Sequence, residues 1–401
     1  MKGSDRLRRL ASYAFVAALA VAAVSCNEAH PNSTLDPHTD LGREIDFLWD
    51  RLLLLGTIVF VLVEVILIYV VFRYRRRENQ GMPPQTHGST KLEIAWTLIP
   101  AVILVFIAVP TVRTIFITQA HAAPGSLNIE VTGHQWWWEF RYPDYGVTTA
   151  NEIYIPAGRT VNFRLRSADV IHSFWAPELG GKRDVVTNRT NYMWYTPDSS
   201  ISSNVWNGFC AEYCGASHAN MRFRVFTVTR QQFESWVAGQ KLPARFGAAV
   251  SAAPTAGTQS GYIFPREQVP DYAVPHSPIP SGLKFTPGLT GNAQRGLKVF
   301  TSSACIGCHA IAGNPMAMGT TGPNLTHVGS RLTIAAGRFP NAAAYLALWI
   351  KNARAMKPEI IMPTLGVDEY DPVLKTKVTA ATGGLTDQQI ADIVAYLTAL
   401  K

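Results

Sequence analysis

Two short stretches of the chain gather side chains that bind soft metals. The first reads CAEYCGASHANM and holds four of them close together: Cys210, Cys214, His218 and Met221. Thiolate, imidazole and thioether ligands in combination favour copper or another soft metal over magnesium or calcium. A disulfide is the alternative that a bare C-x3-C outside the cell allows about as readily. The neighbouring histidine and methionine shift the balance strongly toward a metal.

The second stretch reads CIGCH and contains Cys305, Cys308 and His309. C-x-x-C-H predicts covalent haem attachment, in which two thiols form thioethers to the haem vinyl groups and the adjacent histidine ligates the iron. A chance match or a redox disulfide is the alternative. A methionine is expected as the sixth iron ligand, because it raises the reduction potential. The candidates are Met316, Met318, Met356 and Met362.

The N-terminal segment predicts export. Residues 1–25 combine a basic head, an apolar stretch and small residues before Cys26, which is typical of a bacterial secretion signal. The same residues resemble a lipoprotein cleavage site, at which Cys26 would become a lipidated first residue; an ordinary signal peptide followed by a free cysteine is the alternative. Everything after about residue 120 is then expected in an oxidising exterior, where cysteines pair, bind metal or hold haem.

Two longer apolar runs, about 48–72 and 94–117, predict a transmembrane hairpin within residues 45–118. Each run is long enough to cross a hydrocarbon core of about 30 Å. The loop between them is rich in arginine and is expected on the cytoplasmic side, so the net charge of +8 reflects membrane topology rather than nucleic-acid binding. Glu64 lies deep in the first run, where an ionisable group is costly and often functional. Packing against a polar group of another subunit is the favoured interpretation.

The remainder of the chain divides into three parts, and its 25 prolines and 30 glycines suit linkers between folded units. Residues 121–238 contain short alternating runs that predict an all-β sandwich or barrel. Residues 239–288 are rich in Ala, Pro, Gly, Ser and Thr and predict a linker. Residues 289–401 predict helices, the last beginning with a capping box of Thr386 and Gln389. The apolar face of that last helix comprises Ile390, Ile393, Val394 and Leu397.

The pattern C-x-E-x-C-x3-H-x2-M, with an upstream histidine in HSFWAP, resembles the dinuclear copper site of cytochrome c oxidase subunit II. The resemblance implies a cupredoxin-like fold for the all-β part. It also implies that Cys210 and Cys214 bridge two coppers, while two histidines each hold one copper and two weak ligands complete the site. These further ligands are His172, His218, Met221 and the backbone carbonyl of Glu212. Bridging thiolates would share one electron over both coppers, which suits fast electron transfer and leaves no open position for a substrate.

Two neighbouring segments extend the resemblance. GHQWWW puts Trp136 at the family position where electrons arrive, whereas ordinary packing is the favoured interpretation for Trp137 and Trp138. KLEIAWTLIP resembles the start of the second membrane helix, where Glu93 matches a carboxylate at the mouth of a proton channel; a solvated interfacial glutamate is the alternative. The resemblance further implies that Glu212 presents its carboxylate toward a magnesium ion shared with subunit I.

The sequence around CIGCH resembles class I cytochromes c. The residues that mark the crossing of the first and last helices in that family are present: Gly296, Phe300 and Tyr396. GPNL resembles the segment in which the carbonyl of Pro323 orients the haem histidine, and Met362 in PEIIMPTLG matches the position of the axial methionine best. The other methionines are interpreted as packing residues. Residues 367–384 exceed what a minimal cytochrome needs and have no assigned role.

The fused order of transmembrane hairpin, cupredoxin-like domain, linker and all-α class I cytochrome c domain resembles subunit II of bacterial caa-type oxidases. It implies that electrons pass from haem c to the copper pair and on to subunit I, where dioxygen is reduced to water with proton pumping. The implied partners are oxidase subunits I and III, the bacterial plasma membrane, and a donor such as a cytochrome bc complex or soluble cytochrome c, with both redox domains on the periplasmic face. Two alternatives remain. In the first, the chain passes electrons to a copper-containing nitric oxide reductase. In the second, it delivers copper or haem, which needs exposed, exchangeable ligands.

Overall fold

The structure is a computed structural model that describes residues 30–75, 81, 85, 87–244, 261–274 and 277–401, together with Tyr13 and Ala17. Apart from those two residues, the predicted signal peptide lies outside the described residues, and so does Cys26. The same holds for parts of the basic loop and of the predicted linker. The chain divides into two compact units, Met1–Ser33 and Thr34–Lys401, and the elements described below belong to the second.

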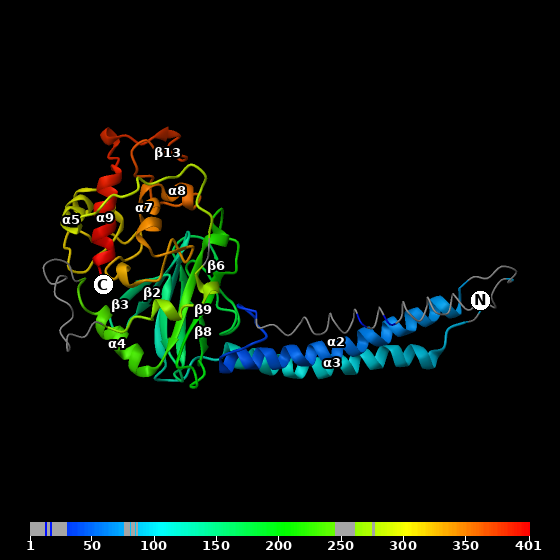
Figure 1. Ribbon diagram of the computed structural model, residues 1–401. Helices are drawn as coiled ribbons and strands as arrows, with labels where there is room; N and C mark the ends of the chain where they lie inside the picture. Colours follow the sequence, from blue (N-terminus) through cyan, green and yellow to red (C-terminus); the bar gives the residue numbers. More distant parts are fainter. Residues whose placement is uncertain are drawn as a thin grey trace. The chain divides into compact units, whose positions relative to one another are not determined.

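Two long apolar helices, α2 (Asp40–Arg73) and α3 (Thr90–Gln119), lie side by side (Figure 1). At 1.5 Å per residue, their 34 and 30 residues extend about 51 and 45 Å, more than a hydrocarbon core requires. Most of their large apolar side chains are exposed, which suits contact with lipid, and Glu64 is half-buried. The predicted hairpin of two long apolar helices is confirmed.

The hairpin is joined to the β domain at both of its ends. Thr39, the N-cap of α2, donates from Oγ1 to the carbonyl of Leu179 at 2.6 Å. After the end of α3, the carbonyl of Ala120 accepts from Trp194 Nε1 at 2.8 Å. The bond to Ala120 pairs a carbonyl at the end of α3, and both bonds fix the β domain to the membrane helices.

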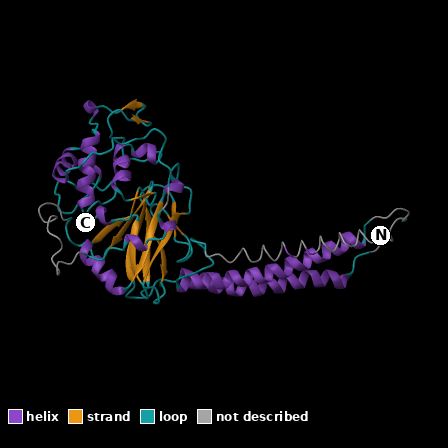
Figure 2. Cartoon of the chain, in the orientation of Figure 1, coloured by secondary structure: helices purple, strands orange, loops and turns teal. Residues whose placement is uncertain are grey.

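Ten strands of the described residues form a sandwich of two five-stranded sheets (Figure 2). They are β1 (Leu127–His134), β2 (Trp137–Tyr142), β3 (Val147–Ala150), β4 (Glu152–Pro156), β5 (Val161–Ser167), β6 (His172–Trp175), β7 (Arg183–Val185), β8 (Asn191–Tyr195), β9 (Ser203–Cys210) and β10 (Arg222–Val228). The strand orders are β3-β2-β1-β5-β8 and β4-β10-β9-β6-β7. Burial alternates along β1, so every second side chain enters the core. The predicted all-β, cupredoxin-like domain is confirmed.

The C-terminal part is helical, with two short hairpins. Its elements are α5 (Ala293–Ser302), α6 (Cys305–Cys308), η5 (Val328–Ser330), β11 (Thr333–Ile334), β12 (Phe339–Pro340), α7 (Ala343–Lys351), α8 (Ala353–Met356), β13 (Tyr370–Asp371), β14 (Thr376–Lys377), η6 (Ala380–Thr382) and α9 (Asp387–Ala399). The predicted capping box of Thr386 and Gln389 begins α9, and the predicted apolar face of that helix is buried. The rings of Phe300 and Tyr396 meet at 5.6 Å between centroids where α5 and α9 cross. The predicted helical cytochrome c fold is confirmed.

The connection between the two domains is partly packed. After α4 (Arg230–Gln240), residues 261–274 include the short helices η3 (Arg266–Gln268) and η4 (Asp271–Ala273). Phe264 is buried in the core of the β domain, and its N–H donates to Tyr154 Oη at 3.2 Å. Because Phe264 and Ala273 are buried in that core, residues 261–274 of the predicted linker pack against the β domain.

Gly296→Ala should destabilise the cytochrome domain. A Cβ at this position would collide with the carbonyl oxygen of Asp392 on α9, so α5 and α9 would have to move apart. Overpacking of this kind costs about 1–3 kcal/mol. Denaturant unfolding of the full chain, followed by haem absorbance, measures the loss. Gly307→Ala is the control, because a Cβ there meets nothing within 4 Å; equal stability of the two variants would contradict the proposed crossing contact.

Candidate metal centre and haem cavity

The residues predicted to bind copper converge at one end of the second sheet. The register Phe174↔Cys210 joins β6 to β9, so the first residue of β6, His172, comes close to the last residue of β9. The loop that follows β9 carries Cys214, makes one turn of 3-10 helix (η1, His218–Asn220), and returns to β10 directly after Met221. Strand pairing therefore fixes both ends of the loop that supplies most of the ligands.

The distances within this cluster suit a shared metal pair. Cys210 Sγ lies 3.7 Å from Cys214 Sγ, 3.8 Å from His172 Nδ1 and 3.2 Å from the carbonyl oxygen of Glu212. Cys214 Sγ lies 3.6 Å from His218 Nδ1 and 3.9 Å from Met221 Sδ. Both cysteines are free thiols, which disfavours the disulfide alternative. Two sulfurs flanked by imidazoles and a thioether are the donor set that copper prefers, so these residues fit a dinuclear copper centre.

The cluster is buried and electrostatically prepared for thiolate. The hydrogen bond from Cys214 lowers the pKa of Cys210, and the hydrogen bond from His172 adds to this effect, whereas burial opposes it. The same hydrogen bond and burial raise the pKa of the Cys214 thiol. Low solvent exposure is shared by His172, Cys210, Cys214 and Met221. Burial argues against a delivery protein, which needs ligands open to exchange.

Surrounding groups hold His172 in place. Its Nε2 lies 2.8 Å from Asp169 Oδ1, and Asp169 also accepts from the backbone N–H of Gln135 at 2.7 Å. Burial lowers the pKa of His172, but Asp169 and Cys210 together outweigh this effect, and the pKa is raised. Behind the ring, a Cβ at Gly133 would lie 2.7 Å from His172 Cδ2, so only glycine fits. With Asp169 on Nε2, the ring presents Nδ1 to the sulfurs.

The three consecutive tryptophans have different surroundings. Trp136 Nε1 donates to the carbonyl of Cys214 at 2.8 Å, which links its ring directly to the metal loop. Trp138 is fully buried among the aromatic rings of the β-sandwich, as the packing interpretation expects. Trp137 stacks on His134 with ring centroids 4.2 Å apart and also lines a cavity of the C-terminal domain. Packing alone therefore describes Trp138 but not Trp137.

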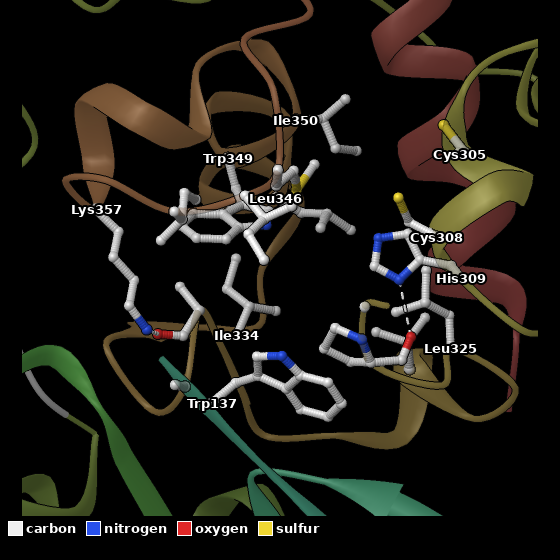
Figure 3. A pocket seen from close by; sticks show the side chains of 18 of the residues that line it. Trp137, Cys305, Cys308, His309, Leu325, Ile334, Leu346, Trp349, Ile350 and Lys357 are labelled. Carbon is white, nitrogen blue, oxygen red and sulfur yellow. Dashed lines mark hydrogen bonds between the residues drawn. The ribbon is translucent and has the colours of Figure 1, made fainter. Parts of the chain in front are cut away.

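That cavity contains the CIGCH motif. Cys305, Cys308 and His309 line one side, while Trp137 and Lys357 line the other (Figure 3). The remaining wall is largely apolar and includes Leu325, Ile334, Leu346, Trp349, Ile350 and Met362. Two thiols, a histidine and a thioether facing one apolar cavity fit a covalently bound haem.

The haem histidine has a defined tautomer. His309 Nδ1 lies 2.8 Å from the carbonyl oxygen of Pro323, which only accepts, so Nδ1 carries the proton and Nε2 is left for iron (Figure 3). Burial lowers the pKa of His309, and the Pro323 carbonyl opposes this change. A neutral imidazole is the form that binds iron.

The four methionines differ in position. Met316 is 59% and Met318 is 76% exposed, and neither lines the haem cavity. Met356 is 1% exposed in the helical core, whereas Met362 lines the cavity. Among these candidates, Met362 is the one whose position suits an iron ligand.

Two residues that we did not predict from the sequence join the domains. Lys357 Nζ donates to the carbonyl of Trp136 at 2.5 Å. Glu152, at the start of β4, accepts from the N–H groups of Leu332 at 2.9 Å and Thr333 at 2.8 Å. Lys357 and Glu152 are 2% and 3% exposed. Their partners lie 221 and about 180 residues away in the chain, and no local sequence pattern signals contacts over such separations.

Two predicted carboxylates are exposed. Glu93 lies in the first turn of α3, and Glu212 lies in the metal loop, where its Oε1 accepts from the N–H of Tyr213 at 3.2 Å. The cluster brings the carbonyl of Glu212 to the sulfurs while its carboxylate is exposed to solvent. Neither carboxylate belongs to the buried cluster.

Three family models match the chain. "Cytochrome C oxidase subunit II, transmembrane domain" matches residues 36–114, "Cytochrome C oxidase subunit II, periplasmic domain" matches residues 146–228, and "Cytochrome c" matches residues 293–401. Together these ranges include the hairpin, most of the β-sandwich and the helical domain.

Two curated relatives match nearly the whole chain. Cytochrome c oxidase subunit 2 of Alkalihalophilus pseudofirmus is 32% identical over 379 residues, which cover 92% of this chain and 91% of the relative. Cytochrome c oxidase subunit 2 of Bacillus subtilis is 30% identical over 388 residues, which cover 92% of each. A solved structure, the periplasmic domain of subunit II of cytochrome oxidase of Bradyrhizobium japonicum, is 30% identical and covers 30% of this chain and 97% of that chain, with a TM-score of 0.28. The curated relatives extend over more than nine tenths of the chain.

Cys214→Ser should abolish copper binding and leave the haem spectrum unchanged. Cys214 contacts the second sulfur, His218 and Met221, so its loss removes the centre of the cluster, whereas the CIGCH cavity lies in the other domain. Metal analysis and near-infrared absorbance of the purified full chain check the outcome. Tyr213→Phe, at a 75% exposed position in the same loop, should bind copper normally. Retained near-infrared copper absorption in Cys214→Ser would sink the assignment.

Proposed function

This chain belongs to the cytochrome c oxidase subunit II family, and on that premise we propose that it carries electrons from its own haem c to a dinuclear copper centre and on to subunit I of a membrane-bound haem-copper oxidase. Reduction of dioxygen to water, coupled to proton pumping, would occur in subunit I. The observation that carries the proposal is the position of one residue pair: Trp137 lines the haem cavity while Trp136 bonds to the carbonyl of Cys214.

The route between the centres is short and continuous. Lys357, at the edge of the haem cavity, donates to the carbonyl of Trp136, and the indole N–H of Trp136 donates to the carbonyl of Cys214. Gln135 Nε2 donates to the same carbonyl at 2.8 Å. The two domains are thus connected through hydrogen bonds that begin at one redox site and end at a ligand of the other.

The chain's residues prepare both sites for transfer without large rearrangement. When bound, the copper pair would supply a one-electron carrier. Cys210, Cys214, His172 and His218 would hold it, with Met221 and the Glu212 carbonyl as weak ligands. Cys305 and Cys308 would attach the haem, and His309 and Met362 would ligate its iron. Because strand pairing and Asp169 already fix the copper ligands, little reorganisation is needed when the charge changes.

Docking of the cytochrome domain is supported by a buried carboxylate. Glu152 accepts four hydrogen bonds from three donor groups of residues 332 and 333, one of them from Thr333 Oγ1 at 2.9 Å. Arg224, also buried, donates to Gly337 O at 3.2 Å from the same face of the β domain. A charged or polar group so deeply buried loses much of its interaction energy if its partner leaves, so these contacts favour the docked arrangement.

Further parts of the proposal concern the surroundings of the complex. We expect the redox domains on the periplasmic face of a bacterial plasma membrane, with residues 1–25 removed as a signal peptide and Cys26 as a candidate lipidation site. Subunits I and III would be the membrane partners, and a cytochrome bc complex or a soluble cytochrome c would reduce the haem. The exposed carboxylate of Glu212 would bind a magnesium ion shared with subunit I. The exposed carboxylate of Glu93 would lie at the mouth of a proton channel.

Trp136→Phe should slow electron transfer from haem c to copper while leaving both spectra unchanged. Phenylalanine keeps an aromatic ring, smaller than the indole, but removes the N–H that donates to Cys214 O. We expect the rate to fall by about tenfold, which corresponds to roughly 1.4 kcal/mol in the barrier. Rapid reduction of the haem in the purified oxidase complex, followed by copper absorbance, measures the step.

The matched control is Trp194→Phe, which also removes an indole hydrogen bond to a carbonyl, that of Ala120, far along the chain from both motifs. Equal rates in Trp136→Phe and the control would reject the route. Copurification with a subunit that consumes oxygen tests the wider function, and a complex that reduces nitric oxide instead would favour the alternative partner.

Glu152→Gln should loosen the docked cytochrome domain. The amide keeps one oxygen acceptor where the carboxylate has two, and it presents N–H groups toward the donors of residues 332 and 333. An imperfectly satisfied buried site costs about 1–3 kcal/mol. The backbone amide of Thr333 should then exchange hydrogen with solvent about tenfold faster or more. Glu130→Gln, which removes half-exposed ion pairs elsewhere on the β domain, should leave that exchange unchanged; protection equal to that of the unmodified chain in Glu152→Gln would contradict the docking role.

A further inference from the structure

Residues 367–384 have no part in the relay described so far, yet they contain a fully buried carboxylate. Asp371, at the end of β13, is 0% exposed. A carboxylate buried in this way is unfavourable unless strong donors surround it. Its donors come from two sources. One is the segment of residues 367–384 itself, called the insertion below. The other is α8, which precedes the residues around Met362, called the methionine loop (residues 360–364).

The insertion supplies backbone donors. The N–H groups of Val373 and Leu374 donate to Asp371 Oδ1 at 2.8 and 3.0 Å. The turn that they form leads into β14, which pairs back on β13 through the register Asp371↔Thr376. The β13–β14 hairpin therefore encloses the carboxylate of Asp371 and fixes its position.

The second donor is the guanidinium of Arg354 on α8. Arg354 Nη1 lies 2.8 Å from Asp371 Oδ1 and 2.7 Å from Oδ2, and its side chain is 12% exposed. Burial raises the pKa of Asp371, but the backbone N–H groups and Arg354 outweigh it and lower the pKa to about 2. The ion pair is accordingly charged throughout the neutral range.

Arg354 also grips the methionine loop on its N-terminal side. Its Nε donates to the carbonyl of Ile360 at 3.3 Å, and its Nη2 donates to the carbonyl of Ile361 at 3.4 Å. These are the two residues immediately before Met362. The guanidinium thus connects the carboxylate of the insertion to the backbone that positions the thioether.

The C-terminal side of the loop is held by the same network. The N–H of Thr364 donates to Asp371 Oδ2 at 3.4 Å, and its hydroxyl donates to Asn352 Oδ1 at 3.2 Å. Asn352 is itself tied to the insertion, because its Nδ2 donates to Glu369 Oε2 at 3.0 Å. Met362 is consequently flanked on both sides by residues bonded to Asp371 or Arg354.

We propose that Asp371, within residues 367–384, and Arg354 on α8 form a clamp, the Asp371–Arg354 clamp. This clamp holds the methionine loop closed and so keeps the thioether of Met362 on the haem iron. This inference rests on the proposed function, in which Met362 is the sixth ligand. Asp371 and Arg354 are positioning residues: neither lines the haem cavity or belongs to the copper cluster, and they act through the backbone on either side of Met362. The insertion thereby gains a role, which is to stabilise the ligand that sets the properties of the haem.

The test measures how often the loop opens, with imidazole as a competing ligand for ferric haem in the purified full chain. The apparent affinity of imidazole rises with the fraction of molecules whose methionine has left the iron. Asp371→Asn and Arg354→Gln should each bind imidazole about tenfold more tightly and weaken the thioether-to-iron absorption band. Arg354→Gln is the second variant because it leaves Asp371 with its backbone donors, should the loss of the carboxylate prevent folding.

The matched control is Asp392→Asn. Asp392 is also a buried carboxylate paired with an arginine, Arg295. This pair joins α5 to α9, and its hydrogen bonds do not involve the methionine loop. This variant should lower the melting temperature and leave imidazole affinity unchanged. The clamp is rejected if both clamp variants bind imidazole with the affinity of the unmodified chain. It is also rejected if Asp392→Asn raises the imidazole affinity as much as the clamp variants do.

Met362→Ala separates failure of the clamp from failure of the axial assignment. Loss of the thioether-to-iron band in Met362→Ala, with unchanged affinities in the clamp variants, leaves the proposed function intact and rejects the clamp alone. A band that persists in Met362→Ala rejects Met362 as the ligand, and the clamp is rejected with it. Loss of the band together with tighter imidazole binding in both clamp variants supports both statements.

Discussion

The junction between the two redox domains depends on one buried amino group. Lys357 is 2% exposed, and burial lowers its pKa to about 7, with Arg338 adding to the effect. Charged or neutral, the group still has N–H bonds to satisfy, and leaving them unpaired would cost a few kcal/mol. Its acceptors are Trp136 O at 2.5 Å and Ala335 O at 3.4 Å, one carbonyl from each domain. The need to satisfy Lys357 therefore holds the haem cavity against the tryptophan that bonds to Cys214.

The copper centre follows a different physical rule, because strand pairing brings two of its residues together. Cys210 ends a strand and His172 begins one, and their register in the sheet brings them together. The intervening loop is closed by the N–H of Cys210, which donates to Met221 O at 3.0 Å, and by the indole of Trp136. A site assembled by strand pairing loses little entropy when it binds metal and changes little when the metal changes charge, which suits electron transfer rather than exchange of the metal.

Local chemistry made much of the molecule predictable. The hairpin follows from apolar length, and α9 follows from the capping box of Thr386 and the spacing of its apolar residues. Each motif contains most of its ligands within a few residues, whereas His172 and Met362 come from separate segments. The junction was not predictable, because Glu152 and Thr333 are 181 residues apart and each looks unremarkable in its own segment. Trp137 was assigned to packing for a related reason: its stacking on His134 is local, whereas its contribution to the haem cavity depends on how the domains dock.

Docking also changes what the covalent fusion does. A flexible tether raises the effective concentration of one domain near the other, but each transfer still waits for an encounter. Here residues 261–274 pack on the β domain, and Glu152, Arg224 and Lys357 are buried between the domains. Buried contacts are screened by salt much less than exposed ones, so on the proposed route the transfer from haem to copper depends on fixed geometry. The fusion thus removes the diffusional encounter from this step of the relay.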